Sequence, residues 1–130
     1  HLIQGNHDRV KGKLRPYWES IEQYAEVNDE NRLAILSHYP ILFYKNQHYG
    51  AVMLYGHVHN TREWELVEKW KKAQWELGIP SRLINVGCMM AYMNYTPRTL
   101  DELLEANPQP MIERTRKDGT NAGENSNGEL

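Results

Sequence analysis

The chain has 130 residues, of which 40% are hydrophobic and 25% charged, so it fits a single globular domain with a moderate core. No apolar run approaches the ~18 residues of a membrane span, and the net charge of -2 argues against a broad nucleic-acid footprint, which leaves nucleic acid only as a substrate. The single cysteine, Cys88, excludes an internal disulfide framework and a cysteine-built zinc site and is typical of a reducing compartment, which predicts a cytoplasmic protein.

Short strands followed by polar residues are predicted in the first half of the chain. Residues 1–4 end a strand, and the glycines and proline of residues 5–16 indicate a loop. Residues 24–27 alternate as a strand does, and the continuous apolar run at 33–36 predicts a buried strand. We therefore expect the polar residues after these strands to lie at an edge of a sheet.

Two further strands and two helices are predicted in the second half. Residues 51–55 form a buried strand that ends at a glycine, and residues 82–87 form another. The clearest helix spans residues 62–77 and is stopped by Gly78. A shorter helix begins at Thr99, whose spacing to a glutamate three residues later matches a capping box.

The long helix carries one apolar stripe, which we expect to face the core because its members recur at offsets of four, three and four. Trp64 and Trp75 lie on the opposite face, where a missing neighbour or local loops would cover them. The stripe consists of Leu66, Trp70, Ala73 and Leu77.

The alternation of strands with helices predicts an α/β or α+β layered domain over residues 1–106. Residues 107–130 are polar and lack aromatic side chains, so we expect a disordered tail. The chain starts without a methionine or a signal peptide, which suggests a piece of a longer protein.

Histidines follow three of the predicted strands, together with one asparagine. Neutral imidazole suits divalent transition metals, and an amide oxygen is an acceptable additional ligand. A lone histidine after a strand is more often a hydrogen-bonded structural residue, and a bare H-x-H pair recurs by chance. The candidate ligands are Asn6, His7, His38, His57 and His59.

The order of three motifs is more specific than any one residue. The segments GNHD (5–8), SHYP (37–40) and YGHVHN (55–60) each follow a hydrophobic strand. In this order they resemble the calcineurin-like metallophosphoesterase superfamily. The later segment INVGCMMAYMNYTPRTLDEL is similar to the closing strand, loop and helix of small bacterial and phage members, so the resemblance covers residues 2–104.

The resemblance implies the C-terminal part of a four-layer β-sandwich flanked by helices, with two divalent metal ions. Manganese is favoured, and iron, zinc or nickel would also suit nitrogen and oxygen ligands. Asn6, His38 and His57 would bind the second metal, and His59 would bind the first.

The same resemblance implies a hydrolytic reaction on a phosphoester substrate. Asn6 and His7 would contact this substrate, and His7 would stabilise the transition state or protonate the leaving alcohol. Asp8 would orient His7, so His7 and Asp8 are the predicted catalytic pair.

The chain departs from the family pattern because it contains neither the D-x-H nor the G-D-x-x-D block that precedes G-N-H-D. Those blocks supply carboxylates, including the one that bridges both metals. We therefore expect full activity only with the missing N-terminal portion of the same domain. The alternative is a catalytically silent metal-binding or interaction module derived from this fold.

Five other residues carry a functional and a structural interpretation each. His48 is a surface histidine or a substrate contact, and Arg62 is an exposed helix-start residue or a phosphate ligand. Cys88 is expected to be a small buried residue, since no basic partner is identifiable. Tyr92 and Tyr95 line a substrate pocket or pack a loop.

Overall fold

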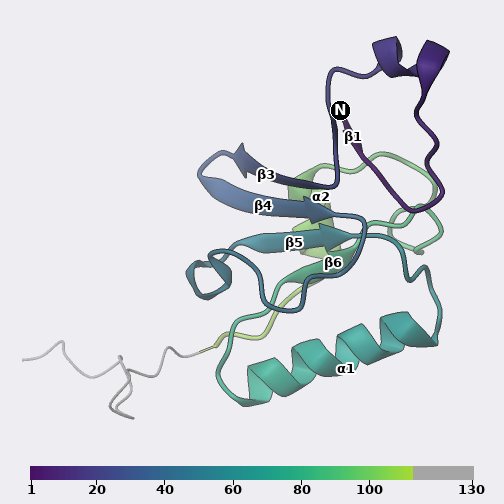
Figure 1. Cartoon of the computed structure of the whole chain (residues 1–130). Coiled ribbons are helices and arrows are strands. Elements are labelled where there is room, and N and C mark those ends of the chain that lie inside the picture. Colours follow the sequence, from purple (N-terminus) through teal and green to yellow (C-terminus); the bar gives the residue numbers. More distant parts are fainter. Residues whose placement is uncertain (113–130) are drawn as a thin grey trace, which may run out of the picture.

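A four-stranded sheet forms the centre of the computed structural model, which describes residues 1–112 (Figure 1). Its strand order is β3-β4-β5-β6, with β3 antiparallel to β4 and the other neighbours parallel. The expected α/β or α+β class is confirmed as a mixed α/β fold. The strands are β3 (Tyr24–Asp29), β4 (Arg32–Ser37), β5 (Val52–Tyr55) and β6 (Leu83–Asn85).

The N-terminal segment forms a separate two-stranded sheet, in which β1 (Leu2–Ile3) pairs in parallel with β2 (Ile21–Glu22). The loop predicted between them is only partly irregular, because the 3-10 helix η1 (Gly12–Tyr17) interrupts it. A second 3-10 helix, η2 (Gln47–Tyr49), precedes β5.

Most side chains of β5 and β6 are buried on both faces of the sheet, which explains the apolar character of these strands. Ile35, Met53 and Leu83 point to one side, where they form a cluster with residues of the long helix. Val52 and Ile84 point to the other side and pack with the chain segment that follows β6. The side-chain alternation of β-strands therefore divides the core into two layers, one on each face of the sheet.

Helix α1 (Arg62–Glu76) covers the first of these layers and confirms the predicted helix (Figure 1). The predicted burial of its apolar stripe is wrong. Leu66 and Leu77 are 63% and 75% exposed, whereas Val67, Lys71 and Gln74 are buried against the sheet.

Polar side chains lie on the sheet-facing side of α1 because their polar ends find partners there. The ammonium group of Lys71 donates to the carbonyl of Leu83 at 3.1 Å and pairs with Glu68 at 2.9 Å. The amide oxygen of Gln74 accepts a hydrogen bond from Gln47. The aliphatic stems fill the interface while these bonds engage the Lys71 ammonium group and the Gln74 oxygen, whereas the buried Gln74 amide nitrogen has no hydrogen-bond partner among the described residues. Hydropathy alone does not predict this arrangement.

Neither tryptophan on this side of α1 needs a missing neighbour as cover. Trp64 is partly buried and packs against both core clusters. The indole nitrogen of Trp75 donates to the carbonyl of Ser81 at 3.1 Å. Local structure therefore covers both, as the simpler of the two interpretations expects.

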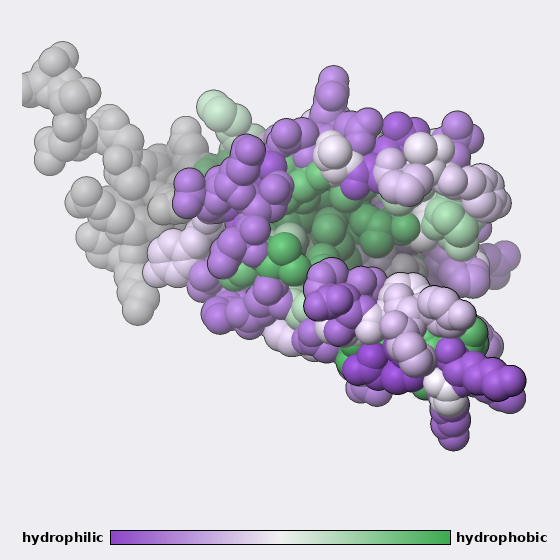
Figure 2. All heavy atoms as spheres, turned by 90° about the horizontal axis from the view of Figure 1, so that it is seen from above, coloured by the Kyte–Doolittle hydropathy of each residue, from purple (hydrophilic) through white to green (hydrophobic). Residues whose placement is uncertain are grey.

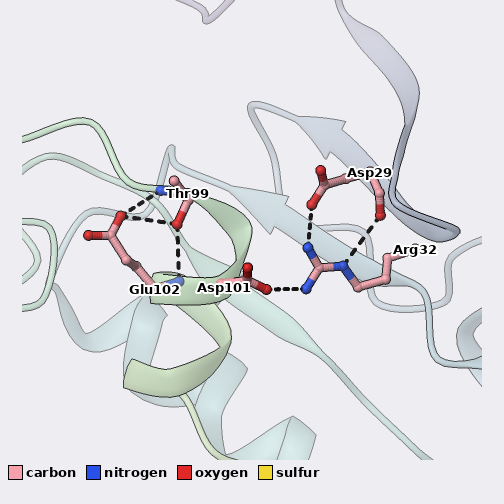
Figure 3. Close-up of polar contacts among 5 residues, drawn as sticks. All are labelled: Asp29, Arg32, Thr99, Asp101 and Glu102. Carbon is pink, nitrogen blue, oxygen red and sulfur yellow. Dashed lines mark hydrogen bonds and ion pairs between the residues drawn. The ribbon is translucent and has the colours of Figure 1, made fainter.

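The short helix α2 (Leu100–Ala106) is fixed at its first turn, as Figure 3 shows. The predicted capping box is confirmed: Thr99 accepts from the backbone of Glu102 at 3.3 Å, and the carboxylate of Glu102 accepts from the backbone of Thr99 at 2.7 Å. Arg32 pairs with Asp101 of α2 and with Asp29 of β3. These contacts hold α2 against the β3–β4 hairpin.

A groove of about 470 Å³ remains between α2 and the sheet, lined in part by Val27, Leu36, Leu54 and Leu100. Figure 2 shows apolar side chains gathered in a hollow and framed by polar ones. The face of the sheet opposite α1 is thus covered only in part.

The helices of residues 1–112 include none with the length and apolar character that crossing a membrane requires. Most of the predicted tail, residues 113–130, lies outside the described residues.

Replacement of Thr99 by alanine removes the oxygen that caps α2. We expect Thr99→Ala to lower the free energy of unfolding by about 1 kcal/mol. Chemical denaturation measures this change, with Glu105→Ala on the same helix as a control. Equal effects of the two substitutions would show that the capping box does not stabilise the fold.

Candidate metal centre

Three strand ends meet at one edge of the molecule. The turn after β1 carries Asn6, the end of β4 carries His38, and the turn after β5 carries His57. A cavity of about 290 Å³ lies where they meet. It is lined by Gly5, Asn6, His7, Asp8, His38, His57 and His59, so every candidate site residue predicted from the sequence borders it.

Three of these side chains are in direct contact. The Nε2 atom of His38 lies 2.8 Å from Oδ1 of Asn6 and 3.2 Å from Nδ1 of His57. Only one ring proton can occupy His38 Nε2, so it cannot donate fully to both neighbours. If that nitrogen is unprotonated, the oxygen of Asn6 faces a lone pair. Hydrogen bonds among these three side chains therefore cannot satisfy Asn6 Oδ1, His38 Nε2 and His57 Nδ1 at the same time.

Glycine is required at position 5 by the His38 ring. A Cβ atom on Gly5 would lie 2.9 Å from two atoms of that ring, closer than real Cβ contacts. At Gly56 a Cβ atom would meet Nδ1 of His38 at an ordinary 3.8 Å. Of the two motif glycines, only Gly5 lets the backbone approach His38 this closely.

Asp8 stabilises the turn that carries His7. Its carboxylate accepts from the backbone N–H of Gly5 at 2.7 Å, and its own N–H donates to the carbonyl of Gly5 at 3.2 Å. The side chain of Gln4 donates to the carbonyl of Asp8 at 3.0 Å. Any orientation of His7 by Asp8 therefore acts through the backbone of this turn.

His59 borders the same cavity with its backbone in the left-handed region, at φ 50°. Its carbonyl accepts from the side chain of Asn85 at 2.7 Å. Asn85 is fully buried, and its side-chain oxygen accepts from the N–H of Gly87 at 2.9 Å. Asn85 thus holds the His59 loop, a role that sequence reasoning missed although a polar residue ends this apolar strand.

Tyr39 is a second residue that sequence reasoning missed. Its ring centroid lies 4.4 Å from that of His57 and 5.1 Å from that of His38. The ring limits how far either imidazole can turn. The signal was its place in the SHYP motif, directly after the predicted ligand.

His48, Tyr92 and Cys88, which the sequence left with open roles, do not line this cavity. His48 lies in η2, before the amino end of β5 and so away from the strand ends that carry the site. The hydroxyl of Tyr92 donates to the carbonyl of Asn85 at 2.5 Å, and burial raises the pKa of Tyr92 to about 12, so it packs a loop. Cys88 is exposed, so the prediction that it is buried is wrong.

Arg62 and Tyr95 stay on the surface. Arg62 lines a shallow hollow of about 410 Å³ beside His57 and His59, and Tyr95 is 76% exposed. A phosphate contact by Arg62 therefore stays a prediction.

The residues present fit a metal ion only in part. In the described part of the chain, no three side chains of His, Cys, Asp and Glu converge in an arrangement that could hold a metal ion. The closely spaced donors are an amide oxygen and two imidazoles, from Asn6, His38 and His57. Their chemistry suits one transition-metal cation and offers no negative charge to a second.

Comparison of the chain with protein-family models, with curated proteins and with solved structures finds no match.

Burial lowers the pKa of His38 below its usual 6.5, and nearby imidazoles, His57 first, lower it further, while Asp8 opposes them. The folded state thus disfavours the protonated ring. The unfolded chain takes up the proton as the pH falls below 6.5, so stability is lost from there down to the lower folded pKa.

In metal-free protein we therefore expect an NMR titration midpoint for His38 below 6.5. The free energy of unfolding should fall as the pH drops below 6.5, until the folded-state pKa of His38 is passed. His38→Asn should flatten this dependence, and His48→Asn should not. A midpoint at or above the usual value would contradict this account.

Substitution of the two motif glycines gives a matched pair. Gly5→Ala should displace the His38 ring and break its contact with Asn6, whereas Gly56→Ala should leave the ring in place. Imidazole ¹⁵N shifts and nuclear Overhauser contacts of His38 measure the difference. Identical spectra for the two variants would show that the close approach of Gly5 does not position the ring.

Proposed function

We propose that the chain is the metal-binding C-terminal part of a metal-dependent phosphoester hydrolase of the calcineurin-like type. The observation that carries the proposal is the convergence of Asn6, His38 and His57 from three separate strand ends. The motif resemblance is independent of that geometry, and both indicate the same residues.

The spacing of the donor atoms supports a bound cation. Ligands about 2.1 Å from a metal are about 3.0 Å apart along an octahedral edge and about 3.4 Å along a tetrahedral one. The separations from His38 Nε2, 2.8 Å to Asn6 Oδ1 and 3.2 Å to His57 Nδ1, are close to these values. A cation would engage all three acceptors, which a single proton cannot do.

A second cation needs groups that this part of the chain does not offer. Of the other two imidazoles in the cavity, His7 and His59, the resemblance assigns only His59 to a metal ion. The carboxylate of Asp8 is engaged by the backbone amide of Gly5. Two adjacent dications repel unless anionic ligands lie between them. We therefore propose that another segment, with the D-x-H and G-D-x-x-D blocks, completes a dinuclear site, for which manganese is favoured.

The four-layer β-sandwich that the resemblance implies is also part of this proposal. In a four-layer sandwich, a second sheet packs on the face opposite α1. The apolar groove along Leu36 and Leu54 supports this, because it leaves part of that face uncovered.

The reaction proposed is hydrolysis of a phosphoester. Bound cations would neutralise the anionic oxygens of the ester and acidify a water. His7 is exposed at the rim of the cavity on a turn held by Asp8, where it can donate a proton to the leaving oxygen. Asn6 borders both the cation position and His7, so it can contact the substrate as well.

One alternative keeps the binding site without the chemistry. The absence of three converging anionic or imidazole ligands among residues 1–112 favours a silent metal-binding or interaction module. Both proposals include binding of a metal cation, but only the hydrolase proposal includes turnover of a substrate.

Metal binding by the full chain tests the shared step. We expect one equivalent of Mn²⁺ or Zn²⁺ in calorimetry, with affinity reduced at least about tenfold by His38→Ala or His57→Ala. His48→Ala is the matched control. Affinity that is unchanged in both ligand variants would overturn the proposed site.

Turnover separates the two proposals. With the acidic blocks supplied in a longer chain, Mn²⁺ should stimulate hydrolysis of an aryl phosphate. His7→Ala should lower kcat by about 10² to 10⁴-fold while the metal content stays the same. Metal binding without hydrolysis would support the silent module, and an unaffected kcat in His7→Ala would refute the role of His7.

A further inference from the structure

The outward face of α1 carries an apolar surface that residues 1–112 leave uncovered. The exposed fractions are 63% for Leu66 and 75% for Leu77, and Ala73 between them is also exposed. Phe43, 68% exposed, extends the surface with its ring edge-on to that of Trp70 at 5.2 Å between centroids. Large apolar side chains clustered in this way mark an interaction site more often than scattered ones do.

The spacing of this surface is that of a helix-pairing seam. Leu66, Trp70, Ala73 and Leu77 recur at offsets of four, three and four, the a/d pattern of two-stranded helix packing. The series of offsets is the same in both directions along the helix. A second copy related by a two-fold axis, with its helix antiparallel, would therefore match it position for position.

This antiparallel register also matches side-chain size. It sets Leu66 opposite Leu77 of the second copy, and Trp70 opposite Ala73. A large residue then faces a small one in each central layer, which lets the two helices approach.

Charge on the flank of the seam fits the same register. Lys69 lies between Leu66 and Trp70 in the sequence, and Glu76 lies between Ala73 and Leu77. In the antiparallel pair, Lys69 of each copy therefore lies beside Glu76 of the other, giving two opposite-charge pairs. A parallel pair would set Lys69 beside the position of Gln74, where no charge meets it.

The sequence of residues 113–130 offers no suitable cover. Residues 113–130 include only Ala122 and Leu130 as hydrophobic residues, too few for a seam of four positions. The fold buries α1 through Val67, Lys71 and Gln74, which lie on a different side of the helix from the seam and leave the seam open to a partner.

We propose that α1 pairs with α1 of a second copy of this chain, antiparallel, through Leu66, Trp70, Ala73 and Leu77. The paired surface is one helix face and Phe43, which is small beside the ~800 Å² per partner of a standard interface. The dimer is accordingly weak and depends on protein concentration.

Sedimentation equilibrium of the full chain over about 10 μM to 1 mM tests the pairing in the range expected of small interfaces. The wild-type chain should shift from monomer toward dimer. Leu66→Lys and Leu77→Lys, at exposed positions that the fold does not need, should each keep it monomeric.

A charge exchange tests the register. Lys69→Glu and Glu76→Lys should each weaken the dimer about two- to thirtyfold, the range for the loss of two exposed ion pairs, and the double variant should restore it. Lys72→Glu makes the same change on α1 away from the seam and should leave dimerisation unchanged.

Each other result overturns part or all of the proposal. A monomer at every concentration, or a dimer that persists in Leu66→Lys and Leu77→Lys, would refute pairing through α1. A dimer abolished by those variants but indifferent to charge exchange would refute the antiparallel register.

Discussion

The parallel pairing of β4 with β5 is the interaction on which the candidate site depends. Leu36 lies opposite Leu54 in this register, so His38 and the GHVH turn leave the sheet at the same edge. The backbone N–H of Gly56 then donates to the carbonyl of His38 at 3.0 Å, which continues the pairing past the strand ends. A shift of one residue would exchange the side chains that β5 contributes to the two core layers and move His57 away from His38, so packing of the core and assembly of the site fix the same register.

Much of this arrangement could be predicted from the sequence, because the signals are local. Continuous apolar runs identified β4 and β5, the threonine and glutamate spacing identified the cap of α2, and polar residues after each strand indicated the edge that carries the site. The buried face of α1 could not be predicted in the same way. Lys71 and Gln74 count as polar in any hydropathy pattern, and their burial depends on the distant partners Leu83 and Gln47.

The distinction between local signals and contacts of distant residues also applies within the site. The ligand types were visible in the motifs, whereas the groups that position them depend on tertiary contacts. Asn85 is 26 residues beyond His59 in sequence and still bonds to its carbonyl, and the role of Tyr39 requires the His57 ring in the turn after the neighbouring strand. Gly5 combines both kinds of signal. The motif predicted that a glycine would let the backbone approach the site closely, but the fold alone shows that it approaches the His38 ring.

Helix α1 connects the candidate site to the proposed pairing surface. Thr61 accepts from the N–H of Glu63 at 3.3 Å and donates to the carbonyl of Val58 at 2.7 Å, so one side chain joins the start of α1 to the loop that carries His57 and His59. The sheet holds one side of this helix through the buried Lys71 and Gln74. A second copy on the seam would hold another side, and the N-terminal turn would be restrained from both. Because that turn carries the loop, pairing that immobilises α1 would also restrict the positions available to His59, the residue proposed to bind the first metal.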